Sequence, residues 1–302
     1  MKTADFKHVA VFCGGNSQER EISLQTGQAV YESLKRSGFN VDLVDTGRVE
    51  DIAFRDYDAA FVALHGRDGE DGKFQAVLEY HDIPYTGSGV GASSVSMNKW
   101  FTKSVWQSAG LNTPSYWITG KNIQLSDFDD VDLPVFVKPV NEGSSIGITH
   151  VENRSDLENA VHIAQQFDDT VLIEKAITGK EYTFSYLNGV DMPLIQLLPA
   201  NGFYDFEAKY ERDDTQYIVS PELKEDVVIR VKQNALLALQ VVGIKGWGRV
   251  DFMIDENGDE WFIEVNSVPG LTSHSLVPKA AASVGVNFDQ VCIRILETAD
   301  HG

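Results

Sequence analysis

Short apolar runs alternate with amphipathic segments over the first hundred residues. Ile22, Val30 and Leu34 fall on one helical face, and Gly38 ends that pattern. The expected strands are Val9–Cys13, Val41–Asp45, Ala59–Leu64 and Pro84–Thr86, and the expected helices are Ile22–Ser37 and Phe74–His81. This alternation predicts a doubly wound parallel sheet, whose ligands gather where the strands end. His65 directly follows one such end.

The pattern changes near residue 100. The expected elements are a helix over Ser93–Gly110, a polar linker over Thr119–Asp132, and strands at Leu133–Lys138, Gly147–Val151 and Thr170–Lys175. Lys99 and Lys103 lie on the expected helix. Ser155 and Glu158 predict a capping box at the start of a further helix.

Two turn dipeptides mark hairpins in the last third of the chain. The expected elements are strands at Glu181–Leu187, Met192–Leu198, Gly248–Ile254 and Glu260–Asn266, and a helix over Glu222–Val242. Asn188-Gly189 separates the first two strands and Asn257-Gly258 the last two. The whole pattern predicts an α/β chain, α+β overall, with domains at 1–100, 101–185 and 186–302.

Composition and charge narrow the class of protein. With 302 residues, 43% apolar and 23% charged, the chain is expected to be globular. Its formal charge of −20 argues against binding to nucleic acid or to an anionic membrane. The chain shows no secretory signal or membrane-spanning run, so we expect a cytoplasmic protein. Cys13 and Cys292 suit two reduced thiols, although a catalytic cysteine stays open.

The last hairpin carries the strongest local chemistry. A two-residue turn at Asn257-Gly258 would place Asp251 opposite Glu264 and Arg249 opposite Asn266. Directly opposed side chains lie about 4.5 to 5.5 Å apart at Cβ, so two carboxylates there repel unless a cation lies between them. Oxygen ligands of this kind suit Mg²⁺, and a neighbouring arginine can stabilise an oxyanion.

Alternation assigns the other side chains of this hairpin to an apolar face. That face is expected to hold Val250, Phe252, Ile254, Trp261, Ile263 and Val265. The alternative is that the polar face is simply solvated, which is usual for a charged strand. Acids placed opposite one another favour the metal site.

A glycine loop follows the strand that ends in Lys138. The segment LPVFVKPVNEGSSIG offers backbone N–H groups, two hydroxyls and an ammonium group to phosphate oxygens. Gly143–Gly147 also matches the G-x-S-x-G motif, but that motif requires a following helix and a strand is expected. The phosphate-binding pattern G-x-x-x-x-G-K-[ST] and the zinc motif H-E-x-x-H are absent. A hydrolase triad is therefore not expected.

Several single residues have both a functional and an ordinary interpretation. Glu174 and Lys175 end a buried strand and could contact adenine, or simply end the strand. His65 could be a ligand or a structural histidine, and Glu19 a binding acid or a solvated charge at a helix start. Tyr210 belongs to a polar and aromatic segment typical of a surface loop or of an active-site lid.

Taken together, these motifs resemble the D-alanine-D-alanine ligase family of the ATP-grasp fold. The resemblance runs from about Val9 to Leu296. The motifs, in family order, are GGNSQEREISL, LHGRDGEDG, PYTGSG, VKPVNEGSSIG, FYDFEAKY, GWGRVDFMID and EVNSVPGLTSHSLVP.

The resemblance implies a role for each site residue. Catalytic roles fall to Glu19, Ser144, Tyr210, Arg249 and Gly270, and substrate contacts to His65, Lys209, Ser275 and Leu276. Nucleotide contacts fall to Lys99, Lys138, Glu174, Lys175, Ile177 and Glu181. Asp251, Glu264 and Asn266 would hold two Mg²⁺, for which Mn²⁺ can substitute.

The implied reaction joins two D-alanine molecules with ATP for cell-wall synthesis. The γ-phosphoryl group first moves to a carboxylate, and the amine of the second D-alanine attacks the acyl phosphate. Because such an intermediate hydrolyses readily, a lid would serve to exclude water. By resemblance the enzyme is also expected to be a homodimer.

Two departures and three alternatives accompany this interpretation. Phe206 stands where many members carry tyrosine, and Asp68 replaces a frequent glycine. The alternatives are a D-alanyl-D-lactate ester former, an ATP-binding module without ligase activity, and another ATP-grasp carboxylate-amine ligase. Ester formers tend to change the tyrosine at position 210, which is present here.

Overall fold

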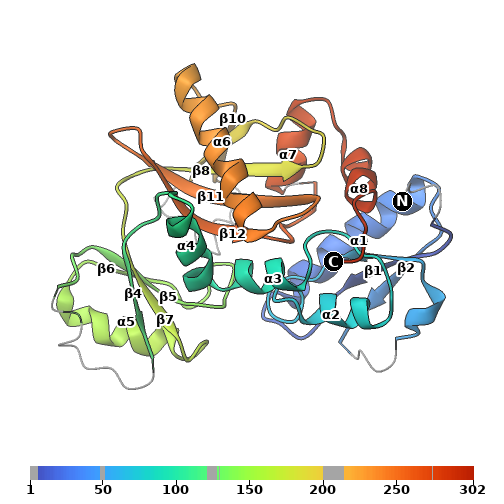
Figure 1. The fold of residues 1–302 in the computed structure, drawn as a ribbon, viewed down its shortest axis with the longest axis horizontal. Coiled ribbons are helices and arrows are strands. Elements are labelled where there is room, and N and C mark those ends of the chain that lie inside the picture. Colours follow the sequence, from blue (N-terminus) through green and yellow to red (C-terminus); the bar gives the residue numbers. More distant parts are fainter. Residues whose placement is uncertain (1–5, 48–51, 121–127, 129, 200–213, 274) are drawn as a thin grey trace.

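The computed structural model describes residues 6–47, 52–120, 128, 130–199, 214–273 and 275–302. Its strands form three sheets, which are separate in Figure 1: a three-stranded sheet at the right, a four-stranded sheet at the lower left and a five-stranded sheet above. Helices α3 (Val90–Met97) and α4 (Lys99–Ser108) lie among them (Figure 1). The predicted mixture of a parallel sheet and hairpins is confirmed.

The first sheet has the strand order β2-β1-β3 and is parallel throughout. Its elements are β1 (Val9–Cys13), α1 (Arg20–Arg36), β2 (Val41–Asp45), a 3₁₀ turn (Phe54–Asp56), β3 (Ala59–Val62) and α2 (Lys73–Tyr80). Phe12 contacts Phe74 of α2, whereas the next residue, Cys13, lies against Gly27 of α1. Since neighbouring strand residues point to opposite faces, the two helices cover opposite faces. The doubly wound prediction is confirmed.

Gly27 sets how closely α1 approaches the sheet. A Cβ added there would lie 2.3 Å from Cys13 Cβ, so only glycine allows this packing. The close approach fixes the start of α1, and with it Glu19, beside the carboxyl end of β1.

The strand predicted at Pro84–Thr86 is wrong. Tyr85 forms two isolated bridges instead, one parallel to Ala60 and one antiparallel to Asp300. Pro84 has no N–H to offer a ladder. The pairing instead brings the C-terminus beside the first sheet, after α8 (Phe288–Leu296) has packed on α1 (Figure 1).

The single helix predicted at Ser93–Gly110 is also wrong. Asn98 adopts an extended conformation between α3 and α4, and its side chain accepts a hydrogen bond from the Phe101 N–H at 2.9 Å. An asparagine cap of this kind starts a new helix. The break places Lys99 in the first turn of α4, where its N–H donates to the Val140 carbonyl.

The four-stranded sheet is antiparallel, with the order β4-β7-β5-β6. Its elements are β4 (Tyr116–Thr119), β5 (Val135–Pro139), β6 (Thr149–Val151), a 3₁₀ turn (Arg154–Asp156), α5 (Leu157–Ala164) and β7 (Val171–Lys175). The capping box predicted for Ser155 and Glu158 is wrong, because α5 starts later, after Asp156, without a side-chain cap. Ser155 donates instead to Asp156.

The five-stranded sheet has the order β10-β9-β8-β11-β12 and is antiparallel. Its elements are β8 (Gly179–Leu187), β9 (Leu194–Leu198), β10 (Gln216–Val219), α6 (Glu225–Val242), β11 (Trp247–Asp255), β12 (Glu260–Asn266) and α7 (Leu276–Ser283). Helix α6 crosses this sheet (Figure 1) and buries Val231, Ala235 and Leu239. Both predicted hairpins are confirmed, and β10 was not predicted.

The pairing of β11 with β12 differs from the prediction near the turn and agrees with it at the site. Met253 pairs with Trp261, one residue out of the register that a two-residue turn would impose. A bulge then shifts the pairing between Asp251 and Phe252, so Asp251 does face Glu264. The predicted opposition of the two acids is confirmed, but the turn alone does not set it.

The bulge also changes the apolar face of the hairpin. Phe262, not Ile263, faces the buried Phe252, and Phe262 is fully buried. Trp261 and Ile263 are only half-buried. Their predicted place on the apolar face is therefore wrong, because one extra residue reverses the side to which each later side chain points.

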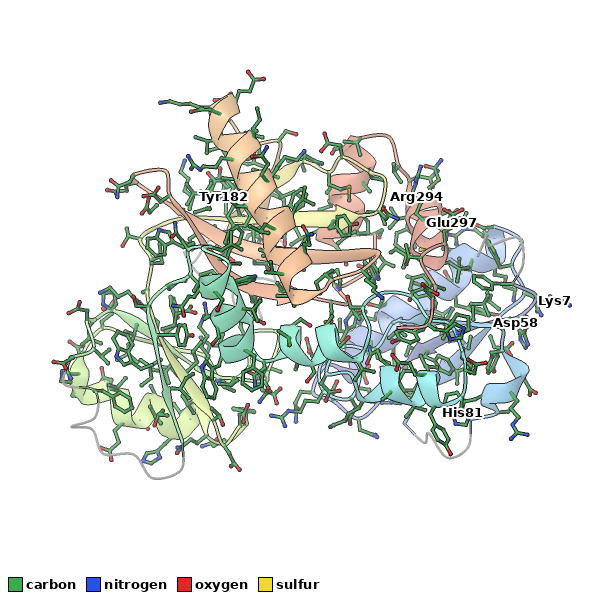
Figure 2. The ribbon with its side chains drawn as sticks, in the orientation of Figure 1. Lys7, Asp58, His81, Tyr182, Arg294 and Glu297 are labelled. Atoms are coloured by element: carbon green, nitrogen blue, oxygen red, sulfur yellow. The ribbon has the colours of Figure 1, made fainter. Side chains whose placement is uncertain are left out.

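The amino ends of the first sheet lie far from the cavity described below. Figure 2 shows Lys7 and Asp58 together at the right-hand edge of the molecule, just before β1 and β3 begin. The Lys7 N–H donates to Asp58 Oδ2 at 2.9 Å. The opposite, carboxyl ends of the strands point to the interior between the sheets.

Two broader predictions meet the structure only in part. The domain limits near residues 100 and 185 stay predictions; β8 spans residue 185 and belongs to the five-stranded sheet. Most of the predicted linker Thr119–Asp132 lies outside the described residues. Within the described part of the chain, no helix combines the length and apolarity needed to cross a membrane.

Candidate active site

A cavity of about 530 Å³ lies where the three sheets converge. Of the predicted site residues, its wall contains Glu19, His65, Ser144, Arg249, Glu264, Asn266, Gly270, Ser275 and Leu276. These residues come from segments as far apart as the start of α1 and the start of α7. A hollow of about 660 Å³ beside Arg20 and Asp45 has none of them in its wall, so we assign it no role.

Glu19 joins the first sheet to the glycine loop. Ser144 Oγ donates to Glu19 Oε1, and both residues are buried. A Cβ on Gly143 would lie 3.0 Å from Glu19 Oε2, so the glycine loop approaches this carboxylate closely. Ser144 and Ser145 have φ angles of 50° and 60°, a strained backbone that is frequent at functional sites. Glu19 is therefore no solvated helix-start charge.

His65 is a buried, neutral imidazole in the cavity wall. Its pKa is lowered to about 4, chiefly by burial; the Val268 backbone acts to raise it, and the nearby Arg249 acts to lower it. Its Nε2 lies 2.9 Å from Thr26 Oγ1. Near neutral pH the ring can therefore donate one hydrogen bond and accept another without carrying charge.

Arg249 and Asp251 form a tight pair on β11. Arg249 Nε and Nη2 donate to the two Asp251 oxygens at 2.8 and 2.7 Å. Thr183 Oγ1 and Asn266 Nδ2 also donate to Asp251, at 2.6 and 3.2 Å. Asp251 is 5% exposed, so this fixed network holds its carboxylate in one orientation.

The second acid of the hairpin faces a lysine. Lys99 Nζ lies 3.7 Å from Glu264 Oε2 and donates to the Glu142 carbonyl at 2.5 Å. Glu264 and Asn266 line both the main cavity and a small adjoining pocket that includes Lys99. Within the described residues, Asp251 thus has Arg249 as a cationic neighbour and Glu264 has Lys99. These two cations offset the repulsion expected between the two carboxylates.

The donor set of this hairpin fits magnesium. Asp251, Glu264 and Asn266 offer only oxygen atoms, from neighbouring strands, beside a polar cavity. Mg²⁺ commonly takes one or two carboxylates and completes its shell with water and phosphate oxygens. Among the described residues, no group of three or more histidines, cysteines and acids forms a metal cluster, so phosphate and water would have to supply the remaining ligands.

The predicted nucleotide residues centre on a buried ion cluster. Glu174 Oε1 lies 2.5 Å from Lys138 Nζ, and its Oε2 lies 2.5 Å from Lys103 Nζ. Burial would raise the pKa of Glu174, but the two lysines lower it below its usual value. Burial lowers the pKa of Lys103 to about 8, an effect that Glu174 partly offsets.

The other predicted nucleotide residues surround this cluster without entering it. Lys175 Nζ donates to the Asp132 and Leu133 carbonyls at 3.1 and 3.0 Å. Ile177 is half-exposed just after β7. Glu181 lies on β8, two residues from Thr183 and so on the face that Asp251 shares.

Three predicted or noted lid residues, Phe206, Lys209 and Tyr210, lie outside the described residues. Their roles stay predictions.

Sequence reasoning missed three residues that the structure brings to the site. Lys103 follows Lys99 by one helical turn, and that spacing could have revealed it. Thr183 could have been found from the alternation of its strand. Glu70 lies inside a motif that was recognised, yet no short-range pattern shows that its carboxylate contacts Val268.

The cysteines take no part in the chemistry. Cys13 and Cys292 are free and buried. Burial, with a nearby aspartate in each case, raises their pKa to about 11 and about 12. Neither would be a thiolate near neutral pH, so a catalytic cysteine is excluded.

A lysine-bearing antiparallel sheet faces a second sheet that carries paired carboxylates and an arginine, with an amino-acid-sized cavity between them. That combination defines an ATP-grasp ligase.

Comparisons with known proteins agree. Family models described as the D-ala D-ala ligase N-terminus and C-terminus match residues 45–88 and 105–297. A D-alanine-D-alanine ligase of Acinetobacter baumannii is 48% identical over 98% of this chain and 97% of its own. The chain belongs to the D-alanine-D-alanine ligase family.

Two solved structures share the whole fold. The Bacillus anthracis D-alanine-D-alanine ligase complexed with ATP has a TM-score of 0.86 at 29% identity, covering 97% of each chain. The VanG D-Ala:D-Ser ligase of Enterococcus faecalis has a TM-score of 0.82 at 26% identity, covering 96% of this chain and 98% of its own. The second likeness makes the acceptor amino acid a question to test.

Proposed function

We propose that this protein uses ATP to join two D-alanine molecules into D-alanyl-D-alanine, a peptidoglycan precursor, with release of ADP and phosphate. One observation carries the proposal: a single cavity gathers Glu19, Ser144, Arg249 and Gly270 from four distant segments. It offers an acid for an ammonium group at one side and an arginine with backbone N–H groups at the other.

In this proposal the first D-alanine binds through its ammonium group to Glu19. Ser144, which already donates to Glu19, would hold that acid in place, with Tyr210 of the lid segment. Neutral His65 would lie beside the same amino acid without repelling its ammonium group. Lys138, Lys99 and Lys209 would neutralise the phosphates of ATP.

The γ-phosphoryl group of ATP passes to a carboxylate oxygen of the first D-alanine, which releases ADP. The neutral amine of the second D-alanine then attacks the acyl carbon. Arg249 and the Gly270 N–H would stabilise the resulting oxyanion. This attack forms the C–N bond. Collapse of the tetrahedral intermediate breaks the C–O bond to phosphate, and the attacking nitrogen loses one proton to become the amide N–H. Ser275 and Leu276, at the start of α7, would receive the carboxylate of the second D-alanine.

Asp251, Glu264 and Asn266 would hold two Mg²⁺, with Mn²⁺ as a substitute. Bound metal would neutralise charge on the phosphate oxygens during transfer. Since Arg249 now contacts both Asp251 oxygens, Asp251 would have to share its carboxylate between the guanidinium and a metal.

Product identity tests the function. The protein, ATP, Mg²⁺ and D-alanine should release phosphate and yield the dipeptide by mass spectrometry, while L-alanine should not replace D-alanine. Adding D-lactate or D-serine as competing acceptors near neutral pH distinguishes an ester former or a D-serine ligase. ADP release without dipeptide would contradict the proposal.

Replacing the arginine tests its role separately. Arg249→Met should lower kcat by about a hundredfold or more while ATP still binds, because one oxyanion donor is commonly worth that much. Isothermal titration with ATP and a turnover assay make the comparison. Full turnover in the variant would show that the oxyanion role is wrong.

We also propose a cytoplasmic homodimer, on family resemblance alone. Analytical ultracentrifugation of the intact protein tests the dimer.

A further inference from the structure

The carboxylate of Glu70 joins two loops that are remote in the sequence. The Gly66 N–H donates to Glu70 Oε2 at 2.8 Å, and the Val268 N–H donates to Oε1 at 3.1 Å. Gly66 follows β3 in the first sheet, whereas Val268 follows β12 in the five-stranded sheet. Each carboxylate oxygen is therefore committed to a different loop.

Both loops carry predicted substrate residues. His65 directly precedes Gly66, and Gly270 lies two residues after Val268. All of them except Gly66 line the main cavity, and Glu70 lines it too. Glu70 also lines the small pocket that holds Lys99 and Glu264.

Glu70 is half-buried, and it lines the cavity. Burial, and then the nearby Glu19, raise its pKa to about 8, although the Gly66 and Val268 N–H groups act to lower it. Each of its two oxygens meets a different backbone N–H, an arrangement that a side chain with one acceptor oxygen cannot reproduce.

We propose that Glu70 is a positioning residue that holds the His65 loop and the Gly270 loop at the separation that the two amino acids require. The inference rests on the proposed ligase function. It assigns Glu70 no direct contact with the reacting atoms. Glu70 would act by keeping the two amino acids correctly placed for attack, because small misplacements of reacting groups lower the rate by large factors.

The neighbouring acid supplies a matched control. Asp71 also accepts backbone hydrogen bonds, from Asp68 N–H at 3.1 Å and Lys73 N–H at 3.2 Å, but both lie within its own loop. Asp71→Asn therefore perturbs the same loop but leaves the hydrogen bond between Glu70 and Val268 unchanged.

The test compares Glu70→Gln, Glu70→Asp and Asp71→Asn in the full-length protein. Glutamine keeps the length but has one acceptor oxygen, and aspartate keeps both oxygens but is one methylene too short. Misplacement of the two loops predicts a fall of about 10- to 100-fold in kcat/KM for D-alanine in both Glu70 variants. The KM for ATP should stay within about twofold, and Asp71→Asn should keep wild-type kcat/KM for D-alanine, as expected for groups outside the bridge.

Comparing the two Glu70 variants separates side-chain length from the carboxyl group itself. If Glu70→Asp recovers wild-type activity, the length of the side chain does not matter and the proposal is overturned. It is equally overturned if folded Glu70→Gln retains wild-type kcat/KM, or if the KM for ATP rises as much as that for D-alanine. Should Glu70→Gln fail to fold, Glu70→Asp alone decides between loss and retention. A wild-type protein that makes no dipeptide would instead refute the function on which the inference rests.

Discussion

At the nucleotide end of the site Glu174 lies between Lys103 and Lys138, whereas at the amino-acid end Glu19 and Glu70 lie near one another beside neutral His65. Burial acts to raise the pKa of Glu174, but its two lysine partners lower that pKa below the usual value. Burial and the nearby Glu19 instead raise the pKa of Glu70 to about 8. The same residue type therefore meets opposite electrostatic surroundings within one site.

The difference matches what each end is proposed to bind. Two ammonium groups against one carboxylate leave one positive charge at the nucleotide end, which suits phosphate. At the amino-acid end Glu19 lies near Glu70, and the ammonium group of a substrate would be attracted to Glu19. The nucleotide end is thus complete as a structural cluster, while the amino-acid end gains stability when its ligand binds.

The largest expected effect comes from breaking the nucleotide cluster. Glu174→Gln leaves two buried ammonium groups without their carboxylate and should lower the free energy of unfolding by about 3 to 5 kcal/mol. Urea denaturation measures the change. Glu152→Gln makes the same chemical change at an exposed side chain and should stay within about 0.5 kcal/mol. Equal stability of both variants would show that the cluster does not hold this end together.

The amino-acid end should respond to pH instead. His65 is neutral in the folded protein down to about pH 4 but titrates near 6.5 when unfolded. Its contribution is full above pH 6.5 and is lost as the pH falls toward 4, by about 3 kcal/mol in total. Comparing urea unfolding of the wild type and His65→Gln across this range isolates the effect, since the variant should lose less stability.

Glu70 acts with the opposite sign in the same measurement. Its raised pKa favours the folded state fully below about pH 4.5, and that contribution is lost as the pH rises through about 8. Because Glu70 is present in both proteins, the difference between wild type and His65→Gln still reports His65. Parallel curves for the two would contradict a neutral, buried imidazole.

The smallest effect is expected at Asp68. Its φ of 66° explains why glycine suits this position, and aspartate tolerates that conformation. Its carboxylate is exposed and lies 2.7 Å from Lys73 Nζ, so its charge is screened from His65. Asp68→Asn should change stability by less than about 0.5 kcal/mol and the KM for D-alanine by less than about twofold. A larger change in KM would mean that the charge of Asp68 affects D-alanine binding from the surface.

Local patterns predicted most elements correctly. The buried run at β1 and the helical spacing of α1 are confirmed almost to the residue, since period and apolarity depend on near neighbours. The errors fall where one residue redirects the chain. Asn98 caps a new helix within a periodic stretch, and Pro84 prevents a ladder.

The metal hairpin shows how a correct result can rest on an incomplete reason. The turn at Asn257-Gly258 predicts the opposition of Asp251 and Glu264, which the structure has. The register near the turn is nevertheless shifted, and a bulge restores it before the acids are reached. A bulge depends on how the whole sheet packs, so no short stretch of sequence specifies it.

The sequence by itself determined most of the chain's elements, its family and the residue types of its chemistry, because these are carried by local spacing and by motifs. Only the tertiary structure decided that Glu19 meets Ser144, that Lys103 completes the Glu174 cluster and that Glu70 joins two loops. Those contacts unite segments up to 198 residues apart. Their partners are selected by the packing of three sheets around one cavity, and that packing is a property of the folded chain as a whole.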